Sequence, residues 1–450
     1  MGSMSQLWIN ARSTLIRALP ARITDKLRGN ETAKRVGSNV AWLGADKLYS
    51  TAVTFIVSIY VARYLGRTDF GLFSYTLAFV TIFQVPATLG LDEILVRELV
   101  RNAKEQSQIL GTALIMRLGS GTLMMGAIAI AVRFARPHDE AAQRLVMITS
   151  LLLIPQAFYI IQRLYNARLL AKFNVIAGNI ALTLVAIMRL AMVHFHASLT
   201  WFVLTNVALF VFNVIALYAI YLSDKERRVR WTFSTRWFKQ LLRDAWPQIP
   251  SGIAGSVQNQ IGALIIGSFM GDDQLGPYAV AYRFYVLLLV VPDIVCQSLS
   301  PSLTRAKAIS DSHFELRLSQ SYRLMLGMYV VSLLPLLFLG LGGIRLLYGA
   351  QFAEAGPLML CFAVPLMMIY VGQLRLWYIV IENQLRYSMF ISLAQAGVSI
   401  IANYILIRRF GAVGAVGAIV CAAIVVFAAD AVFTQGRRNT RAIVRAFSFK

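Results

Sequence analysis

Charged side chains occur inside stretches of the chain that are otherwise apolar, and their types could carry chemistry. A charge at the middle of a bilayer costs on the order of 3 kcal/mol on insertion scales, so it faces a cavity or a partner. If these stretches cross a membrane, such positions are the first candidates for a functional site. The set comprises Lys47, Arg117, Arg189, Arg283 and Arg375, together with Asp46, Asp293, Glu382 and Asp430.

The five cations predict a positively charged lumen that accepts an anionic substrate. They fall in both halves of the chain and at several depths. The planar fork of arginine suits phosphate, because it donates two parallel hydrogen bonds. Local pairing is the alternative for Lys47 beside Asp46, and for Arg375 near Glu382. No acid lies near Arg117, Arg189 or Arg283 in the sequence, so these three are the strongest substrate-binding candidates.

The acids are candidates for ion coupling. A carboxyl group in a low-dielectric cavity favours its protonated form and can carry a proton through a conformational cycle. Asp46 and Asp293 lie furthest inside the apolar stretches. Asp430 is the third candidate, although its place near the inner end of the last stretch also fits a solvated end group.

The elements that must position these residues are membrane-spanning helices. The chain has 450 residues, of which 58% are hydrophobic and 14% charged, whereas an ordinary globular chain has about a quarter charged residues. A spanning helix needs roughly 20 apolar residues. We therefore expect an all-α polytopic membrane protein with twelve spans, over 39–63, 70–90, 109–132, 143–162, 173–193, 198–222, 245–269, 277–300, 322–347, 357–380, 387–407 and 412–434.

The basic residues predict the orientation of these spans. The net charge is +22, which in a soluble protein would suggest nucleic acid. With the N-terminus inside, 30 Lys and Arg residues fall in inner segments and 8 in outer loops. Cytoplasmic loops carry such an excess, so we expect both termini in the cytoplasm and no nucleic-acid partner.

The chain repeats weakly with itself at an offset of 205 residues. LGRTDFGLF at 65–73 aligns with MGDDQLGPY at 270–278, and each copy follows the first span of a six-span unit. Because six is even, the units are parallel repeats with a cleft between them. We expect a basic leader (1–36), a first bundle (37–222), a basic linker (223–243), a second bundle (244–436) and a basic tail (437–450).

Three sequence segments carry a family resemblance. LGRTDFGLF at 65–73, GLDEILVREL at 90–99 and NYILIRRFGAVGAVGA at 403–418 resemble polysaccharide flippases of the Wzx type, in the multidrug/oligosaccharidyl-lipid/polysaccharide exporter superfamily. That family usually has a proline in the last turn, where this chain has Arg408 and Arg409. The resemblance otherwise extends over nearly the whole chain in span count and length.

The resemblance implies a fold, a substrate class and a location. Members form two six-helix bundles arranged as a V around a central cavity. They move undecaprenyl diphosphate-linked O-antigen, capsule or exopolysaccharide units across the bacterial inner membrane by alternating access, in several cases with an ion gradient. The implied partners are this lipid-linked oligosaccharide, membrane lipids and polysaccharide polymerase machinery.

Other functional classes remain as alternatives. A small-molecule antiporter of the multidrug branch would favour an acidic, aromatic cavity rather than arginines, and a lipid II flippase usually has two further helices. A membrane glycosyltransferase or polymerase would carry a large outer loop. The sequence lacks a GxxxxGK[ST] loop, an HExxH motif, paired CxxC and a GxSxG elbow, so we expect no enzyme, no cofactor and no metal site.

Overall fold

A computed structural model describes residues 31–223, 229–246 and 248–447, and this described part of the chain is helical. Most of the leader predicted over 1–36 lies outside the described residues. The first half comprises α3 (Glu31–Thr88), α4 (Asp92–Arg101), α5 (Gln106–Ala135), α6 (Glu140–Ser150), α7 (Leu153–Gln156), α8 (Ile160–Ala167), α9 (Ala171–His194) and α10 (Leu199–Ser223). The rest comprises α11 (Thr235–Ala245), α12 (Gln248–Phe269), α13 (Asp272–Ile309), α14 (Asp311–Phe338), α15 (Ile344–Tyr348), α16 (Ala355–Cys361), α17 (Ala363–Ile381), α18 (Leu385–Phe410), α19 (Ala412–Val432) and α20 (Thr434–Phe447).

The turn predicted after the first span of each half is a glycine with positive φ. Gly66 has φ 76° and divides α3 into two helices that fold back on one another. Gly271 has φ 88° and precedes α13 in the same way. A side chain is rarely tolerated in this backbone region, so both copies of the repeat use glycine for the same turn.

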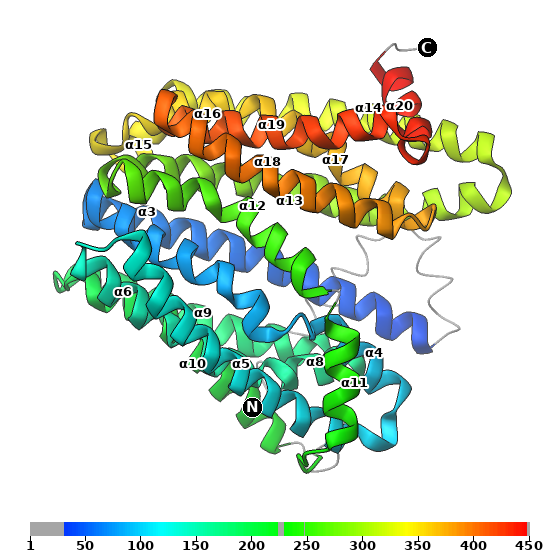
Figure 1. The fold of residues 1–450 in the computed structure, drawn as a ribbon, viewed down its shortest axis with the longest axis horizontal. Coiled ribbons are helices and arrows are strands. Elements are labelled where there is room, and N and C mark those ends of the chain that lie inside the picture. The colour runs from blue at the N-terminus through cyan, green and yellow to red at the C-terminus, as the bar shows by residue number, and fades with distance from the viewer. Residues whose placement is uncertain (1–30, 224–228, 247, 448–450) are drawn as a thin grey trace, which may run out of the picture.

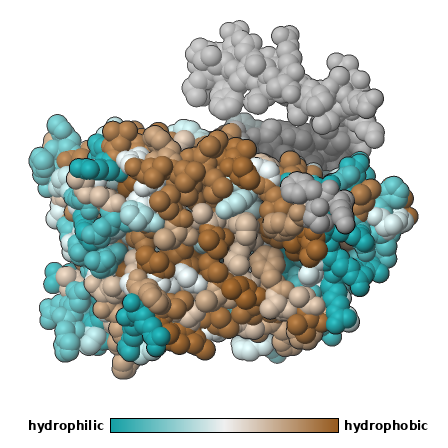
Figure 2. Space-filling model, turned by 90° about the horizontal axis from the view of Figure 1, so that it is seen from above, coloured by the Kyte–Doolittle hydropathy of each residue, from teal (hydrophilic) through white to brown (hydrophobic). Residues whose placement is uncertain are grey.

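The described helices that are long and apolar enough to cross a membrane account for most of the expected crossings. Ten segments meet this description, and the first of them, Asp46–Arg101, contains the reversal at Gly66. Counting that reversal as two crossings and adding the 22-residue α12 gives the twelve expected spans among the described residues. Figure 2 shows the corresponding surface, an apolar belt between two hydrophilic ends.

The two halves form a V (Figure 1). The first half, α3 to α10, and the second half, α12 to α19, approach each other at the end that carries α6 and α15. They diverge toward the end that carries α4, α11 and α20. The predicted orientation assigns the first end to the outside and the second to the cytoplasm, and we use "outer" and "inner" for them below.

Two amphipathic helices lie in the predicted linker and tail. In α11, Trp237, Leu241 and Ala245 are buried, while basic side chains on its other face are exposed. In α20, Asn439 and Ala442 are among the buried residues, and the helix packs on α14 and α19. An apolar stripe on an otherwise basic helix explains why both dock on the bundles instead of crossing the membrane.

Candidate functional site

Arg283 lies on α13 where the two halves meet. Its guanidinium stands 4.8 Å from the centre of the Phe70 ring, which belongs to α3 of the first half. The side chain is partly exposed and makes no hydrogen bond or ion pair with any residue that the structure describes. A cation–π contact leaves all five N–H donors of the guanidinium available to a ligand.

Arg189 is a second cation without a carboxylate. Its guanidinium lies 5.7 Å from the centre of the Phe73 ring, which stacks 6.3 Å from the Phe70 ring that Arg283 contacts. Its Nε donates to Thr205 Oγ1 at 2.8 Å, and Nη2 donates to Asn206 Oδ1 at 2.7 Å. Both acceptors are neutral residues of α10. The hydrogen bonds orient the guanidinium but leave its charge uncompensated, so Arg189 and Arg283 form a positively charged pair of sites contributed by the two halves.

Arg117 has a different environment, in the inner part of the first half. It is buried, and its Nη2 donates to Asp92 Oδ1 at 2.6 Å. Arg163 Nε donates to the same carboxylate oxygen at 2.9 Å. Two guanidinium groups thus share one carboxylate, and Nε and Nη1 of Arg117 have no partner among the described residues. The cluster keeps one net positive charge.

Arg375 and Asp430 pair with each other inside the second half. The two hydrogen bonds measure 2.7 and 2.9 Å, and both side chains are buried. Tyr387 and Asn439 donate to the carboxylate as well, at 2.9 and 3.0 Å. The charges of Arg375 and Asp430 are therefore compensated in this conformation. The pairing of Arg375 with Glu382, considered from the sequence, does not form, because Glu382 accepts from Lys307 at 2.6 Å.

The remaining candidates lie apart from one another. Lys47 is exposed near the inner end of α3, and the neighbouring Asp46 interacts with the Asn179 amide of α9. Asp293 on α13 is partly exposed and has no ion pair within the described part of the chain. The predicted cationic set is thus divided: Arg189 and Arg283 come together, whereas Lys47, Arg117 and Arg375 have separate surroundings.

Ion pairs connect the two halves at the outer end. Arg67 binds Glu354 through two hydrogen bonds of 2.6 and 3.0 Å, and its Nε lies 2.9 Å from Asp273 Oδ1. Arg136 binds Asp272 through two hydrogen bonds of 2.6 and 2.9 Å. At the inner end, the ion pairs of the described residues stay within one half or join the first half to α11, as between Arg97 and Asp244.

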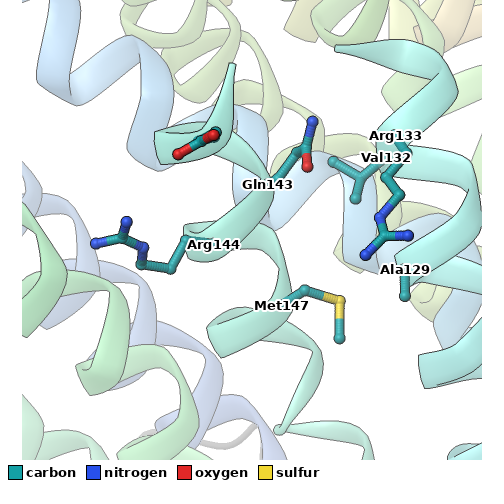
Figure 3. A pocket seen from close by; sticks show the side chains of 7 residues that line it. Ala129, Val132, Arg133, Gln143, Arg144 and Met147 are labelled. Carbon is teal, nitrogen blue, oxygen red and sulfur yellow. The ribbon is translucent and has the colours of Figure 1, made fainter. Parts of the chain in front are cut away.

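A surface hollow of about 310 Å³ lies between α5 and α6 at the outer end. Figure 3 shows Arg133 on one side of it and Arg144 on the other, with Gln143 between them. The hollow belongs to the first half alone and contains none of the candidate residues, so it is separate from the site between the halves.

Sequence reasoning missed Asp92 and Arg163 as companions of Arg117. They are 25 residues before and 46 residues after it in the chain, and only the packing of α4 and α8 against α5 brings them together. The place of Asp92 in the segment GLDEILVREL is the one signal that could have suggested it. The outer arginines Arg67 and Arg136 were counted for orientation and given no role.

Comparison with known proteins identifies the family to which this chain belongs. The model of a family described as polysaccharide biosynthesis protein matches residues 36–306, which is more than half of the chain. The chain belongs to the polysaccharide biosynthesis protein family. A curated relative, the succinoglycan biosynthesis transport protein ExoT of Rhizobium meliloti (strain 1021), is 27% identical over 344 residues. The match covers 73% of this chain and 65% of that relative, so the chain spans just under two thirds of its length.

The fold of this family member is similar to those of solved transporters, among them MATE family transporters of the MOP superfamily. An inward-facing multidrug resistance MATE family transporter aligns with a TM-score of 0.68 at 14% identity, over 88% of this chain and 96% of that one. The lipid II flippase MurJ in an inward closed conformation gives 0.67 at 15% identity, over 91% of each chain. An outward-facing MATE family transporter gives 0.52 at 14% identity, over 94% of this chain and 98% of that one. The chain thus shares its fold with these proteins.

Proposed function

We propose that the protein is a flippase that moves an undecaprenyl diphosphate-linked oligosaccharide from the inner to the outer leaflet of the bacterial inner membrane. Its family, its relative among the transport proteins and the MurJ likeness support a lipid-linked cargo. In this proposal the diphosphate enters from the inner opening of the V and reaches the two halves where they converge.

The observation that carries the proposal is the uncompensated charge of Arg283. A cation between the halves, with a second one on the same stacked pair of phenylalanines and without a carboxylate among the described residues, strongly favours an anion as its ligand. Because Arg283 belongs to the second half and Arg189 to the first, a diphosphate that bridges them contacts both moving parts. Its binding energy therefore depends on how the halves are arranged, which is what couples a ligand to a conformational change.

We assign the remaining candidates to supporting roles in this proposal. Arg117 with Arg163 provides a first anion contact on the inner side, where Asp92 holds the guanidinium groups until cargo arrives. Asp46 and Asp293 are the acids available for ion coupling. Asp430 is committed to Arg375, so we place this pair in the structure of the second half, and we infer no enzymatic step.

The proposal can be tested in cells that depend on this protein for a surface polysaccharide. We expect Arg283→Gln and Arg189→Gln to abolish assembly of the polysaccharide while the protein is made at a normal level. Arg409→Gln is the matched control, because Arg409 is an exposed outer-end arginine without a partner among the described residues. Normal polysaccharide in the Arg189/Arg283 double variant would refute the proposal, and loss of organic-cation export from that variant would favour the multidrug antiporter.

A further inference from the structure

The two copies of the internal repeat contact each other at the outer end, and the contact is reciprocal. A Cβ atom added to Gly71 would lie 1.9 Å from the carbonyl oxygen of Asp272. A Cβ atom added to Gly276 would lie 2.2 Å from the carbonyl oxygen of Arg67. Residues 67 and 272, like 71 and 276, are separated by the repeat offset of 205, so each turn presses its backbone against the glycine of the other.

The ion pairs that cross this contact all join a cation of the first half to an acid of the second. The first half supplies the cations Arg67 and Arg136, and the second half supplies the acids Asp272, Asp273 and Glu354. Complementary charge on two surfaces that touch stabilises their contact and sets their register. The arrangement disfavours separation of the outer ends as long as these pairs are intact.

The Arg136–Asp272 pair is the stronger of the two connections. Its side chains are 6% and 12% exposed, whereas those of Arg67 and Glu354 are 23% and 57% exposed. Arg136 also donates to the carbonyl oxygen of Gly267 at 2.6 Å and stacks 3.8 Å from the centre of the Tyr75 ring. A well-buried pair with several partners is screened little by solvent, while an exposed pair contributes little.

The position of Arg136 is itself fixed by the first half. Gln143 donates to the carbonyl oxygen of Arg136 at 2.7 Å, and Asp139 accepts from its Nη1 at 2.9 Å. The guanidinium is therefore presented by a rigid turn between α5 and α6 toward the first residue of α13. Because the first half already holds Arg136 in position, the contact can re-form after each opening with a small loss of conformational entropy.

We propose that Arg136 and Arg67, with the glycine contact between them, form the outer gate, and that cargo leaves only when these pairs separate. The proposal rests on the transport function given above, and it adds the residues that determine release. Removing Arg136 leaves the carboxylate of Asp272 without its guanidinium, so the outer-closed arrangement loses stability relative to an outer-open one. Removing Arg67 also lowers the stability of the outer-closed arrangement, by a smaller amount.

Distance measurements between spin labels test the gate without any cargo. Labels at His138→Cys and Ala353→Cys report on the outer ends of the two halves, and labels at Lys104→Cys and Ser312→Cys report on the inner ends; all four native residues are exposed. The background has Cys296, Cys361 and Cys421 replaced by serine or alanine. We expect the Arg136→Gln and Asp272→Asn variants to shift the population toward a longer outer distance and a shorter inner distance, by roughly a hundredfold in the equilibrium constant.

Matched variants separate a gate from general damage to the fold. Arg133→Gln removes an exposed arginine in the last turn of α5 that has no ion pair among the described residues, and we expect its distances to equal those of the parent. Arg67→Gln should shift the equilibrium roughly threefold to tenfold. Gly71→Ala should open the outer ends by steric contact, whereas Gly119→Ala, whose Cβ would meet no atom within 4 Å, should leave them closed.

Two results would overturn the gate. One is an unchanged outer distance in folded Arg136→Gln and Asp272→Asn proteins, and if these do not fold, an unchanged outer distance in Gly71→Ala serves instead. The other is an equal shift in Arg133→Gln. A failure of lipid transport with the distance shifts intact would contradict the proposed cargo and leave the gate standing.

Discussion

The buried and half-buried arginines of this protein differ in what neutralises them. Arg136 and Arg375 each bind a carboxylate through two hydrogen bonds. Arg189 and Arg283 have only neutral or aromatic neighbours among the described residues. Substitution of a paired arginine leaves an acid behind and weakens the structure, whereas substitution of an uncompensated one removes a charge that only a ligand would meet.

Arg375 should behave as a structural residue. In the Arg375→Gln variant the buried carboxylate of Asp430 loses its counter-charge, which costs about 3 kcal/mol or more. We expect the apparent Tm in detergent to fall by several degrees, and the double variant Arg375→Met, Asp430→Leu to recover most of the loss. Arg386→Gln, an exposed change near the start of α18, is the control. An unchanged Tm in Arg375→Gln would contradict this assignment.

Sequence reasoning identified the charged positions, but it could rank them only by the acids that lie nearby in the chain. The cost of a charge in the bilayer is local information, so Arg189 and Arg283 were both found from the sequence. The partner of Arg375 is 55 residues away on another helix, and Arg117 shares Asp92 with Arg163 only after α4, α5 and α8 pack. These ion pairs form only when the helices pack, and the spacing of the residues along the chain does not predict them.

At the scale of elements, the linker between the halves is partly an ordered helix that belongs to the first half. Trp237 of α11 is buried, and its Nε1 donates to Glu105 Oε2 at 2.7 Å. The segment before α11 is bound to the first half as well, because the backbone N–H of Thr232 donates to the carbonyl oxygen of Ser107 at 3.2 Å. The contacts of α11 thus lie with the first half, and we expect α11 to move with α5 when the halves rearrange.

Trp237→Ala should release α11 from the first half. Loss of a fully buried tryptophan costs about 3–5 kcal/mol, and here it also leaves Glu105 without this donor. We expect faster proteolysis within 229–246, measured by limited digestion of the protein in detergent or nanodiscs. Lys239→Gln changes an exposed residue of the same helix and should leave the cleavage rate unchanged. Equal cleavage of the Trp237→Ala and parent proteins would contradict the docking of α11.

The spanning helices could be predicted from the composition of the sequence, whereas the surface helices α11 and α20 could not. Each predicted span overlaps a helix of the structure, because about 20 apolar residues have one stable arrangement in a bilayer. The short α11 and α20 carry their apolar residues on one face among many basic ones. Their composition resembles that of a solvated loop, and they were assigned to the linker and tail for that reason.

At the scale of the whole molecule, the ion pairs that join the two halves lie at one end, as far as the described residues show. Arginines of the first half meet acids of the second half at the outer end, and the helices diverge toward the inner end (Figure 1). The parallel repeat predicted this arrangement in outline, since two similar six-span units meet along a shared axis. The reciprocal glycine contact could not be predicted, because it depends on how closely the two turns approach.

The central claim is that the uncompensated charges between the halves carry a lipid-linked diphosphate across the membrane. The most direct test is a liposome assay with the purified protein and a labelled undecaprenyl diphosphate-linked oligosaccharide confined to one leaflet, followed by its exposure on the other. We predict protein-dependent exposure that Arg283→Glu abolishes and Arg409→Glu preserves, in proteins of equal stability. Exposure at the parent rate in Arg283→Glu would contradict the account.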